Sequence, residues 1–476
     1  MKTLLMFGLA LSLAACSLVP PLDRPPAPLP ARYDATVVEQ ATGADLGWRE
    51  MFTDARLRRL IELALVNNRD LRIATMNLEA VRAQFDISSA ARLPSVSATG
   101  GMTRQRIPAD AGAGASGVQE QKTAGLGLSA FEIDLFGRVR AQSEAAFARY
   151  LASEQGRRAA QISLVAAVAD AYFAEVLASQ QLGLTDSTLE DWRSSLRIAR
   201  LLNEAQQNSG LDIAQAEGQV ASAEADLEAR RRTLAQARNA LQLLVGAAVP
   251  AGLDGALPLE MQALPTALPA GLPSDLLTRR LDILQAEQAL VASNADIGAA
   301  RAAFFPQISL TASLGFASSS VGSLFSGAQK AWSFSPQITQ PLFQGGRLRA
   351  ELDLARIRNN VAVADYERVI QIAFREVADG LAARATYGNQ IAAQLRTVAS
   401  VERARELSDL RYRAGQEGRL QLLDVQRTAY AARQALLELR RDEFRATTAL
   451  YKALGGGHDA FGAPREVVPA GRSNPG

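Results

Sequence analysis

The chain has 476 residues, a formal net charge of +2, one cysteine and one histidine. A single thiol excludes an internal disulfide, and one thiol with one imidazole is too few for the usual cysteine/histidine zinc site. The near-neutral charge argues against a protein that binds nucleic acid by neutralising many phosphates.

The first fifteen residues are typical of a signal peptide. Lys2 precedes an apolar run, residues 3–15, that is too short to span a bilayer as a mature helix. The run ends in LAAC (residues 13–16), which resembles the bacterial lipobox and implies cleavage before Cys16 and lipidation of that cysteine. Ser17, in place of aspartate, favours the outer membrane by the lipoprotein sorting pattern. A plain signal peptide with an incidental cysteine is the alternative.

Residues 16–48 are predicted to be a lipid-anchored tether. Six of the nineteen prolines fall within residues 20–30 (PPLDRPPAPLP), and such a segment is extended rather than helical. Beyond the tether we expect a first repeat at 49–250, a Pro/Gly-rich linker at 251–273, and a second repeat at 274–457. A flexible tail at 458–476 completes the chain.

Two long proline-free spans predict long helices. No proline occurs between Pro108 and Pro250, or between Pro341 and Pro464, and proline costs about 3 kcal/mol inside a helix. Apolar residues recur in these spans at steps of three and four, as in an amphipathic or coiled helix. Turn residues at 208–210 and 414–418 break each span once. We therefore expect antiparallel helical hairpins at 138–246 and 347–455, with further helices at about 55–92 and 275–303.

Four segments alternate apolar with small polar residues, at about 94–106, 123–134, 306–317 and 331–342. Strands of this length and pattern are typical of a transmembrane β-barrel. A soluble sheet with one wet face is the alternative. Four strands do not close a barrel, and an open edge in lipid leaves backbone groups unpaired. The chain is therefore expected to oligomerise, with eight strands from two copies or twelve from three; periodicity does not choose between them.

The two halves of the chain match each other. Arg92-Leu93-Pro94 corresponds to Phe304-Phe305-Pro306, and residues 211–213 (LDI) correspond to 423–425 (LDV), in both cases 212 positions later. The simplest account is an internal duplication of a helix–strand–strand–helix–helix unit.

The sequence resembles the outer-membrane efflux protein family, of the TolC/OprM-like, lipidated NodT type. The resemblance spans nearly the whole mature chain and is carried, with the lipobox, by these segments: FEIDLFGRVR (131–140), FFPQISLTASLG (304–315), PLFQGGRLRA (341–350), FREVADGLAAR (374–384), RYRAGQEGRLQLLDVQR (411–427) and LYKALGGG (450–457).

The resemblance implies a mainly helical chain with a transmembrane β portion. Three copies would form one twelve-stranded outer-membrane barrel that continues into an α-helical barrel in the periplasm. It also implies a lipid-anchored homotrimer that serves as the exit duct of a tripartite efflux pump for drugs or other small molecules. The implied partners are a periplasmic membrane-fusion adaptor, an inner-membrane RND-type transporter and the outer-membrane lipid.

The same resemblance assigns a periplasmic gate to the tips of the helical hairpins. It implies Leu420 as the apolar constriction, with Asp424, Arg427 and Tyr412 as polar groups that hold or release the closed tip. Asp424 and Arg427 are three residues apart and can pair within or between subunits. Asp212 is the counterpart in the first hairpin, where the expected Tyr-Arg-x-Gly is absent.

No catalytic residue, metal site or cofactor is predicted, apart from the covalent lipid on Cys16. Residues 112–117 satisfy the G-x-G-x-x-G pattern, but they lie between two predicted strands rather than between a strand and a helix. His458 has no nucleophile motif to serve. Two other functions remain open: an outer-membrane duct for type I protein secretion, and a non-conducting structural envelope lipoprotein.

Overall fold

The computed structural model describes residues 17–23, 25–26, 46–107, 117–250, 252–253, 255–265, 268 and 276–456. The predicted signal peptide, the lipidation site at Cys16, His458 and the tail at 458–476 lie outside the described residues. The chain divides into two compact units, and each takes segments from both halves of the sequence repeat. Unit 1 comprises Met1–Pro26, Asn77–Glu154 and Gln285–Glu367; unit 2 comprises Ala27–Met76, Gln155–Leu284 and Arg368–Gly476.

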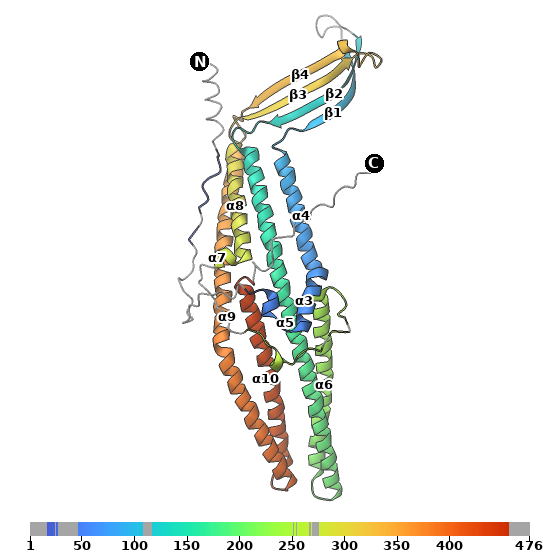
Figure 1. The fold of residues 1–476 in the computed structure, drawn as a ribbon, viewed down its shortest axis with the longest axis vertical. Helices are drawn as coiled ribbons and strands as arrows, with labels where there is room; N and C mark the ends of the chain where they lie inside the picture. Colours follow the sequence, from blue (N-terminus) through green and yellow to red (C-terminus); the bar gives the residue numbers. More distant parts are fainter. Residues whose placement is uncertain are drawn as a thin grey trace. The chain divides into compact units, whose positions relative to one another are not determined.

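Unit 1 contains a four-stranded antiparallel sheet in the order β1-β2-β3-β4 (Figure 1). The strands are β1 (Val96–Ile107), β2 (Gly117–Glu132), β3 (Gln307–Ser318) and β4 (Lys330–Thr339). The register places Leu126 beside Ala98 on one side and Leu314 on the other. Within the described chain, β1 and β4 each pair on one side only, so both edges of the sheet are open.

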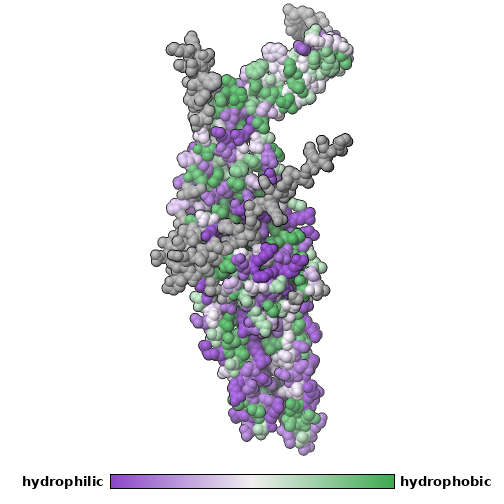
Figure 2. All heavy atoms as spheres, in the orientation of Figure 1, coloured by the Kyte–Doolittle hydropathy of each residue, from purple (hydrophilic) through white to green (hydrophobic). Residues whose placement is uncertain are grey.

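The two faces of the sheet differ in chemistry. In the regular part of the register, even-numbered residues share one face, because successive side chains of a strand point to opposite sides. The large exposed apolar side chains described on the strands all have even numbers: Val96, Met102, Val118, Leu126, Leu314, Trp332, Phe334 and Ile338. Apart from Ile107 at the end of β1, the odd positions of the regular register carry Ser, Thr, Gln, Gly and Ala, as at Thr99 and Ser313. We call these the apolar face and the small-polar face; apolar side chains cover much of the visible surface of the sheet (Figure 2).

One residue of the expected alternation departs from it. Ala130 continues the even-numbered apolar series in the sequence, but a β-bulge shifts the register between Leu128 and Phe131. Ala130 adopts a left-handed backbone with φ of 47°, and its amide donates to the hydroxyl of Thr311 at 3.1 Å. The extra residue moves the apolar position from Ala130 to Phe131, which pairs with Leu310.

Helices enter and leave the sheet at one end of its strands. The chain reaches β1 from α4 (Arg69–Ala90) and β3 from α8 (Leu281–Ala302); it leaves β2 into α5 (Arg138–Glu204) and β4 into α9 (Arg347–Arg413). Within unit 1, Phe85 of α4 contacts the rings of Phe147 and Tyr150 of α5, with centroids 5.2 and 6.5 Å apart. The hydroxyl of Ser293 on α8 bonds to Asn359 on α9 at 3.0 Å.

The segment that follows Cys16 lies against α8. Asn294 donates to the carbonyl of Pro20 at 2.8 Å, and Arg301 donates to the carbonyl of Leu18 at 3.4 Å. Val19 approaches Gly298 so closely that a Cβ there would lie 2.4 Å from a Val19 methyl carbon. Glycine at 298 therefore makes room for the N-terminal segment.

Unit 2 is built around two helical hairpins. The far part of α5 packs with α6 (Gly210–Val245), and the far part of α9 packs with α10 (Arg419–Ala453). The predicted hairpins are thus observed, and the resemblance's mainly helical fold with a small β portion is confirmed. In the second turn Gly415 is left-handed, with φ of 69°. In the first turn the left-handed residue is Gln206, with φ of 56°, whereas Gly210 already belongs to α6.

The remaining helices of unit 2 complete its core. These are α2 (Trp48–Met51), α3 (Ala55–Asn67) and the short α7 (Leu276–Arg279). An 18-residue window of α5 is apolar enough to span a bilayer, but 67% of it is buried inside the protein. This burial is typical of a core helix, and Tyr172 and Phe173 of α5 are among the most deeply buried side chains.

Asp54 links three parts of this core through hydrogen bonds. Its side chain caps α3 by accepting from the amides of Arg56 and Leu57 at 2.8 and 3.1 Å. The same carboxylate accepts from the hydroxyl of Tyr172 at 2.6 Å and from Gln262 at 2.9 Å. Burial, followed by the bond to Asp54, raises the pKa of Tyr172, so the hydroxyl remains a donor at neutral pH.

Candidate gate at the hairpin tips

The two hairpin turns lie at the same end of unit 2 (Figure 1). Leu420, at the start of α10, is 67% exposed although it is a large apolar residue. Asp424 and Arg427 are also exposed, and steps of four and three place all three side chains on one side of α10. Tyr412, at the end of α9, is half-buried. The predicted gate residues therefore share the tip of one hairpin.

Arg427 reaches across to the other hairpin. Its Nε donates to Oε1 of Gln219 on α6 at 2.6 Å. Gln219 is only 2% exposed, and its Nε2 has no hydrogen-bond partner among the described residues. Within the described chain Arg427 forms no ion pair with Asp424, so a link between these two residues in neighbouring subunits stays a prediction.

Arg419 of α10 also bonds to the first hairpin. Arg419, which is buried, donates to the hydroxyl of Ser195 on α5 at 2.9 Å, and its guanidinium carbon lies 5.5 Å from the ring centre of Tyr412. Among the described residues, the ring of Tyr412 therefore packs against the guanidinium of Arg419.

Tyr430 forms the most connected of these links. Its hydroxyl donates to Asp226 on α6 at 2.5 Å and lies 2.7 Å from the hydroxyl of Thr185 on α5. The ring also meets Trp192 edge-on, with centroids 6.1 Å apart. Burial, with the bond to Asp226, raises the pKa of Tyr430, which keeps the phenol protonated. We call the three pairs Arg419–Ser195, Arg427–Gln219 and Tyr430–Asp226 the tip latch.

Asp212, the predicted counterpart in the first hairpin, has a local role in the described chain. It forms a capping box with Ser209: the Ser209 hydroxyl accepts from the Asp212 amide at 3.4 Å, and the Asp212 carboxylate accepts from the Ser209 amide at 2.9 Å. This arrangement fixes the first turn of α6 rather than a contact with another helix.

Sequence reasoning missed Arg419, Gln219 and Tyr430. Arg419 lies within the tip motif, but it is a charged residue at the first position of a helix. Such residues are usually exposed to solvent, so the sequence gives no sign of its burial. Its burial depends on α5, a helix more than two hundred residues away in the chain. The Ser209-x-x-Asp212 spacing, in contrast, is a recognisable capping pattern.

In the first half of α5, a half-buried carboxylate predicts a measurable pH dependence. Burial raises the pKa of Asp170 from 3.8 to about 6, despite the attraction of Arg445 and Arg441, and its Oδ1 has no hydrogen-bond partner among the described residues. A carboxyl whose pKa is higher in the folded protein costs stability once it ionises, so stability falls as pH rises from about 4 to about 6.

We therefore expect Asp170→Asn to stabilise the protein above pH 6, by about 3 kcal/mol at most, and to leave stability below pH 4 nearly unchanged. Unfolding of the detergent-solubilised protein at pH 4 and pH 7.5 measures this difference. A variant that is less stable than the wild type at pH 7.5 would show that attraction to the arginines outweighs burial.

Known proteins resemble this chain in sequence and in fold. The family model described as outer membrane efflux protein matches residues 60–247 and 272–456. The chain belongs to this family. The probable efflux pump outer membrane protein TtgC of Pseudomonas putida is 46% identical over 465 residues, which is 96% of each chain.

Solved structures agree in fold. A membrane protein from Pseudomonas aeruginosa is 41% identical with a TM-score of 0.86, covering 92% of this chain and 100% of that chain. The open state of the MtrE outer membrane channel of Neisseria gonorrhoeae is 38% identical with a TM-score of 0.86, covering 93% and 98%. The predictions of the family, the fold and the outer-membrane location are confirmed, and the family is one of channel proteins rather than enzymes.

Proposed function

We propose that the protein is the outer-membrane exit duct of a tripartite efflux pump and works as a trimer. The observation that carries the proposal is a sheet whose apolar face is exposed and whose two edges are open. In lipid the exposed apolar face is favourable, whereas open edges are not, since their backbone groups find no water. Pairing β4 of one copy with β1 of the next satisfies both edges, and three copies of four strands give a barrel of twelve.

The small-polar face would then line the channel. Most of its side chains are small or uncharged, with Glu132 beside Ser309 as the charged exception, so a lumen built from them offers little chemical discrimination between solutes. The duct would conduct passively and perform no reaction. Selection of drugs or other small molecules, and the energy for their transport, would come from the inner-membrane RND-type transporter, joined to the duct by a periplasmic adaptor.

The hairpin tips would form the gate at the periplasmic end. Exposed Leu420 side chains from three copies would meet as an apolar constriction, while Asp424, Arg427 and Tyr412 hold the closed arrangement. The tip latch supports this role, because it consists of only three hydrogen bonds, and a hydrogen bond to a charged group contributes about 1.5–3 kcal/mol. An adaptor that docks on the tips needs only modest binding energy to break them, and Asp212 would keep the first tip ordered meanwhile.

The lipid on Cys16 would add a second attachment to the membrane. Residues 18–20 are held on α8, the helix that leads directly into β3. This contact places the residues after Cys16 beside the part of the chain that enters the sheet, as anchoring in the same membrane requires.

Ion conductance tests the proposed duct. The purified mature protein, reconstituted in planar lipid bilayers, is expected to produce discrete conductance steps of uniform size. A structural envelope lipoprotein that braces the periplasm would produce none at any protein concentration, and that result would overturn the proposal.

A further inference from the structure

At the end of the sheet away from the helices, the apolar face carries cationic side chains. On β1 the even-numbered series continues from Met102 to Arg104 and Arg106. On β2 it passes from Ala124 to Lys122 and Glu120, and on β4 from Trp332 to Lys330. Because the strands are antiparallel, these positions all lie near the two strand-connecting loops.

The charge is confined to this face. At the same end, the small-polar face carries Gln105, Gln119 and Gln121, which are uncharged. Charges placed only to keep the loops soluble would have no reason to avoid one face. The apolar face instead carries four cations and a single anion, Glu120, among its described residues in this region.

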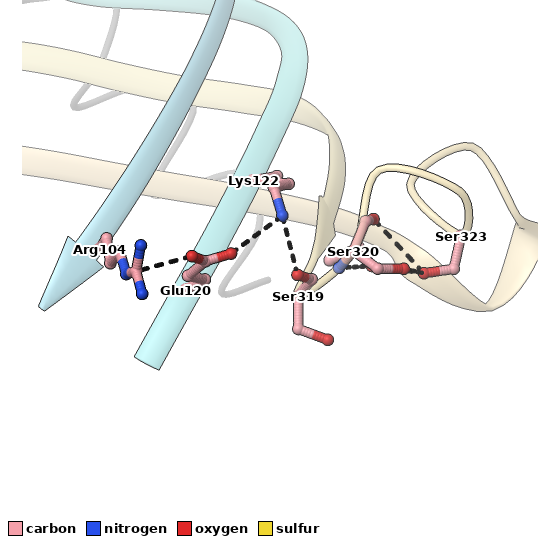
Figure 3. Close-up of polar contacts among 7 residues, drawn as sticks. Arg104, Glu120, Lys122, Ser319, Ser320 and Ser323 are labelled. Atoms are coloured by element: carbon pink, nitrogen blue, oxygen red, sulfur yellow. Dashed lines mark hydrogen bonds and ion pairs between the residues drawn. The ribbon is translucent and has the colours of Figure 1, made fainter. Parts of the chain in front are cut away.

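Only part of this charge is neutralised internally (Figure 3). Glu120 lies 3.2 Å from Nε of Arg104 and 3.1 Å from Nζ of Lys122. Lys122 also donates to the carbonyl of Ser319 at 3.2 Å and is mostly buried. The side chain of Arg104 remains 65% exposed, and Arg106 and Lys330 are exposed as well.

The loop after β3 is held by contacts between serine hydroxyls and carries an aromatic ring. The hydroxyls of Ser318 and Ser320 each lie 2.7 Å from that of Ser323, which closes the turn after β3. Phe325 meets Phe316 edge-on, with ring centroids 5.5 Å apart. Aromatic rings and cations therefore border the apolar band together, and Phe316 pairs directly with Lys330. Such a border is typical of the boundary between lipid acyl chains and headgroups.

We propose that Arg104, Arg106 and Lys330 bind the phosphate groups of the glycolipid in the outer leaflet of the outer membrane, namely lipopolysaccharide. The inference rests on the proposed duct, in which the helices extend into the periplasm and the opposite, loop end of the sheet meets the outer leaflet. Arginine pairs with phosphate through two parallel hydrogen bonds, and lysine acts as a point charge. Since Lys330 is on β4 and the arginines are on β1, closing the barrel brings them together at each junction between copies.

Binding of defined lipopolysaccharides to the purified full chain in detergent tests this proposal. Native mass spectrometry is expected to show that the wild type binds bisphosphorylated lipopolysaccharide roughly tenfold more tightly than the enzymatically dephosphorylated form. The triple variant Arg104→Gln/Arg106→Gln/Lys330→Gln is expected to lose this preference. The matched variant Arg231→Gln/Arg232→Gln/Arg403→Gln, which removes three exposed cations from helices, is expected to retain it.

Three results would overturn the proposal: a wild type without preference for phosphate, a triple variant that keeps the preference, or displacement of the glycolipid by millimolar inorganic phosphate. The wild-type comparison decides the question even where the triple variant fails to fold. Conductance of the triple variant in planar bilayers is expected to equal that of the wild type, so failure of this proposal is distinguishable from failure of the duct.

Discussion

Leu314→Arg is expected to abolish assembly in the outer membrane. Leu314 is 66% exposed at the centre of the apolar face, between Leu126 and Trp332. An arginine at the bilayer midplane of a barrel costs about 2–4 kcal/mol, and a trimer would carry three of them. We expect the oligomer to disappear from outer-membrane fractions, as judged by gel electrophoresis of unheated samples.

Ser313→Arg is the matched control for this change. Ser313 is the preceding residue of the same strand and belongs to the small-polar face, where its hydroxyl lies 2.8 Å from that of Ser333. An arginine there would project into a water-filled lumen, so the oligomer should form normally. Equal loss of the oligomer in both variants, or in neither, would contradict the assignment of the two faces.

Breaking the tip latch is expected to raise conductance severalfold. Arg427→Ala removes the bond to Gln219, and Tyr430→Phe removes the bond to Asp226. These bonds join α10 to the first hairpin, so their loss frees the second tip to move outward. Single-channel recordings of the double variant in planar bilayers measure the effect, and Gln219→Ala should reproduce the part due to Arg427.

Arg413→Ala provides the control for the loss of a charge at the tip. Arg413 is exposed and lies 2.9 Å from Asp409 of its own helix, and among the described residues it makes no link across the hairpins. Its replacement should leave conductance unchanged. A wild-type conductance for the Arg427/Tyr430 variant, or an equal increase for Arg413→Ala, would show that the latch does not control opening.

The sequence was sufficient for the elements whose pattern is local. Helical spacing and the absence of proline predicted the hairpins, and alternation predicted the four strands, because a segment with one apolar face repeats its apolar residues at the period of its own helix or strand. The bulge at Ala130 was not predictable in this way, since it depends on a hydroxyl of a strand that follows about 180 residues later.

The tip latch shows a second limit. Leu420, Asp424 and Arg427 were found through a family motif, whereas buried Gln219 and Arg419 resemble ordinary surface residues in the sequence. Their burial arises only when two hairpins from different halves of the chain pack together. For the same reason each compact unit contains segments from both sequence repeats. The two repeats have the same order of elements, but equivalent elements of the two repeats pack in the same unit.

The mass of the detergent-extracted assembly tests the central claim, that one chain supplies only part of a lipid-embedded cylinder. Native mass spectrometry of the mature protein is expected to give three times the mass of the single chain, with neither free monomer nor larger rings. A stable monomer that stays soluble after detergent removal would contradict the account, because its open edges and exposed apolar face would then lie in water.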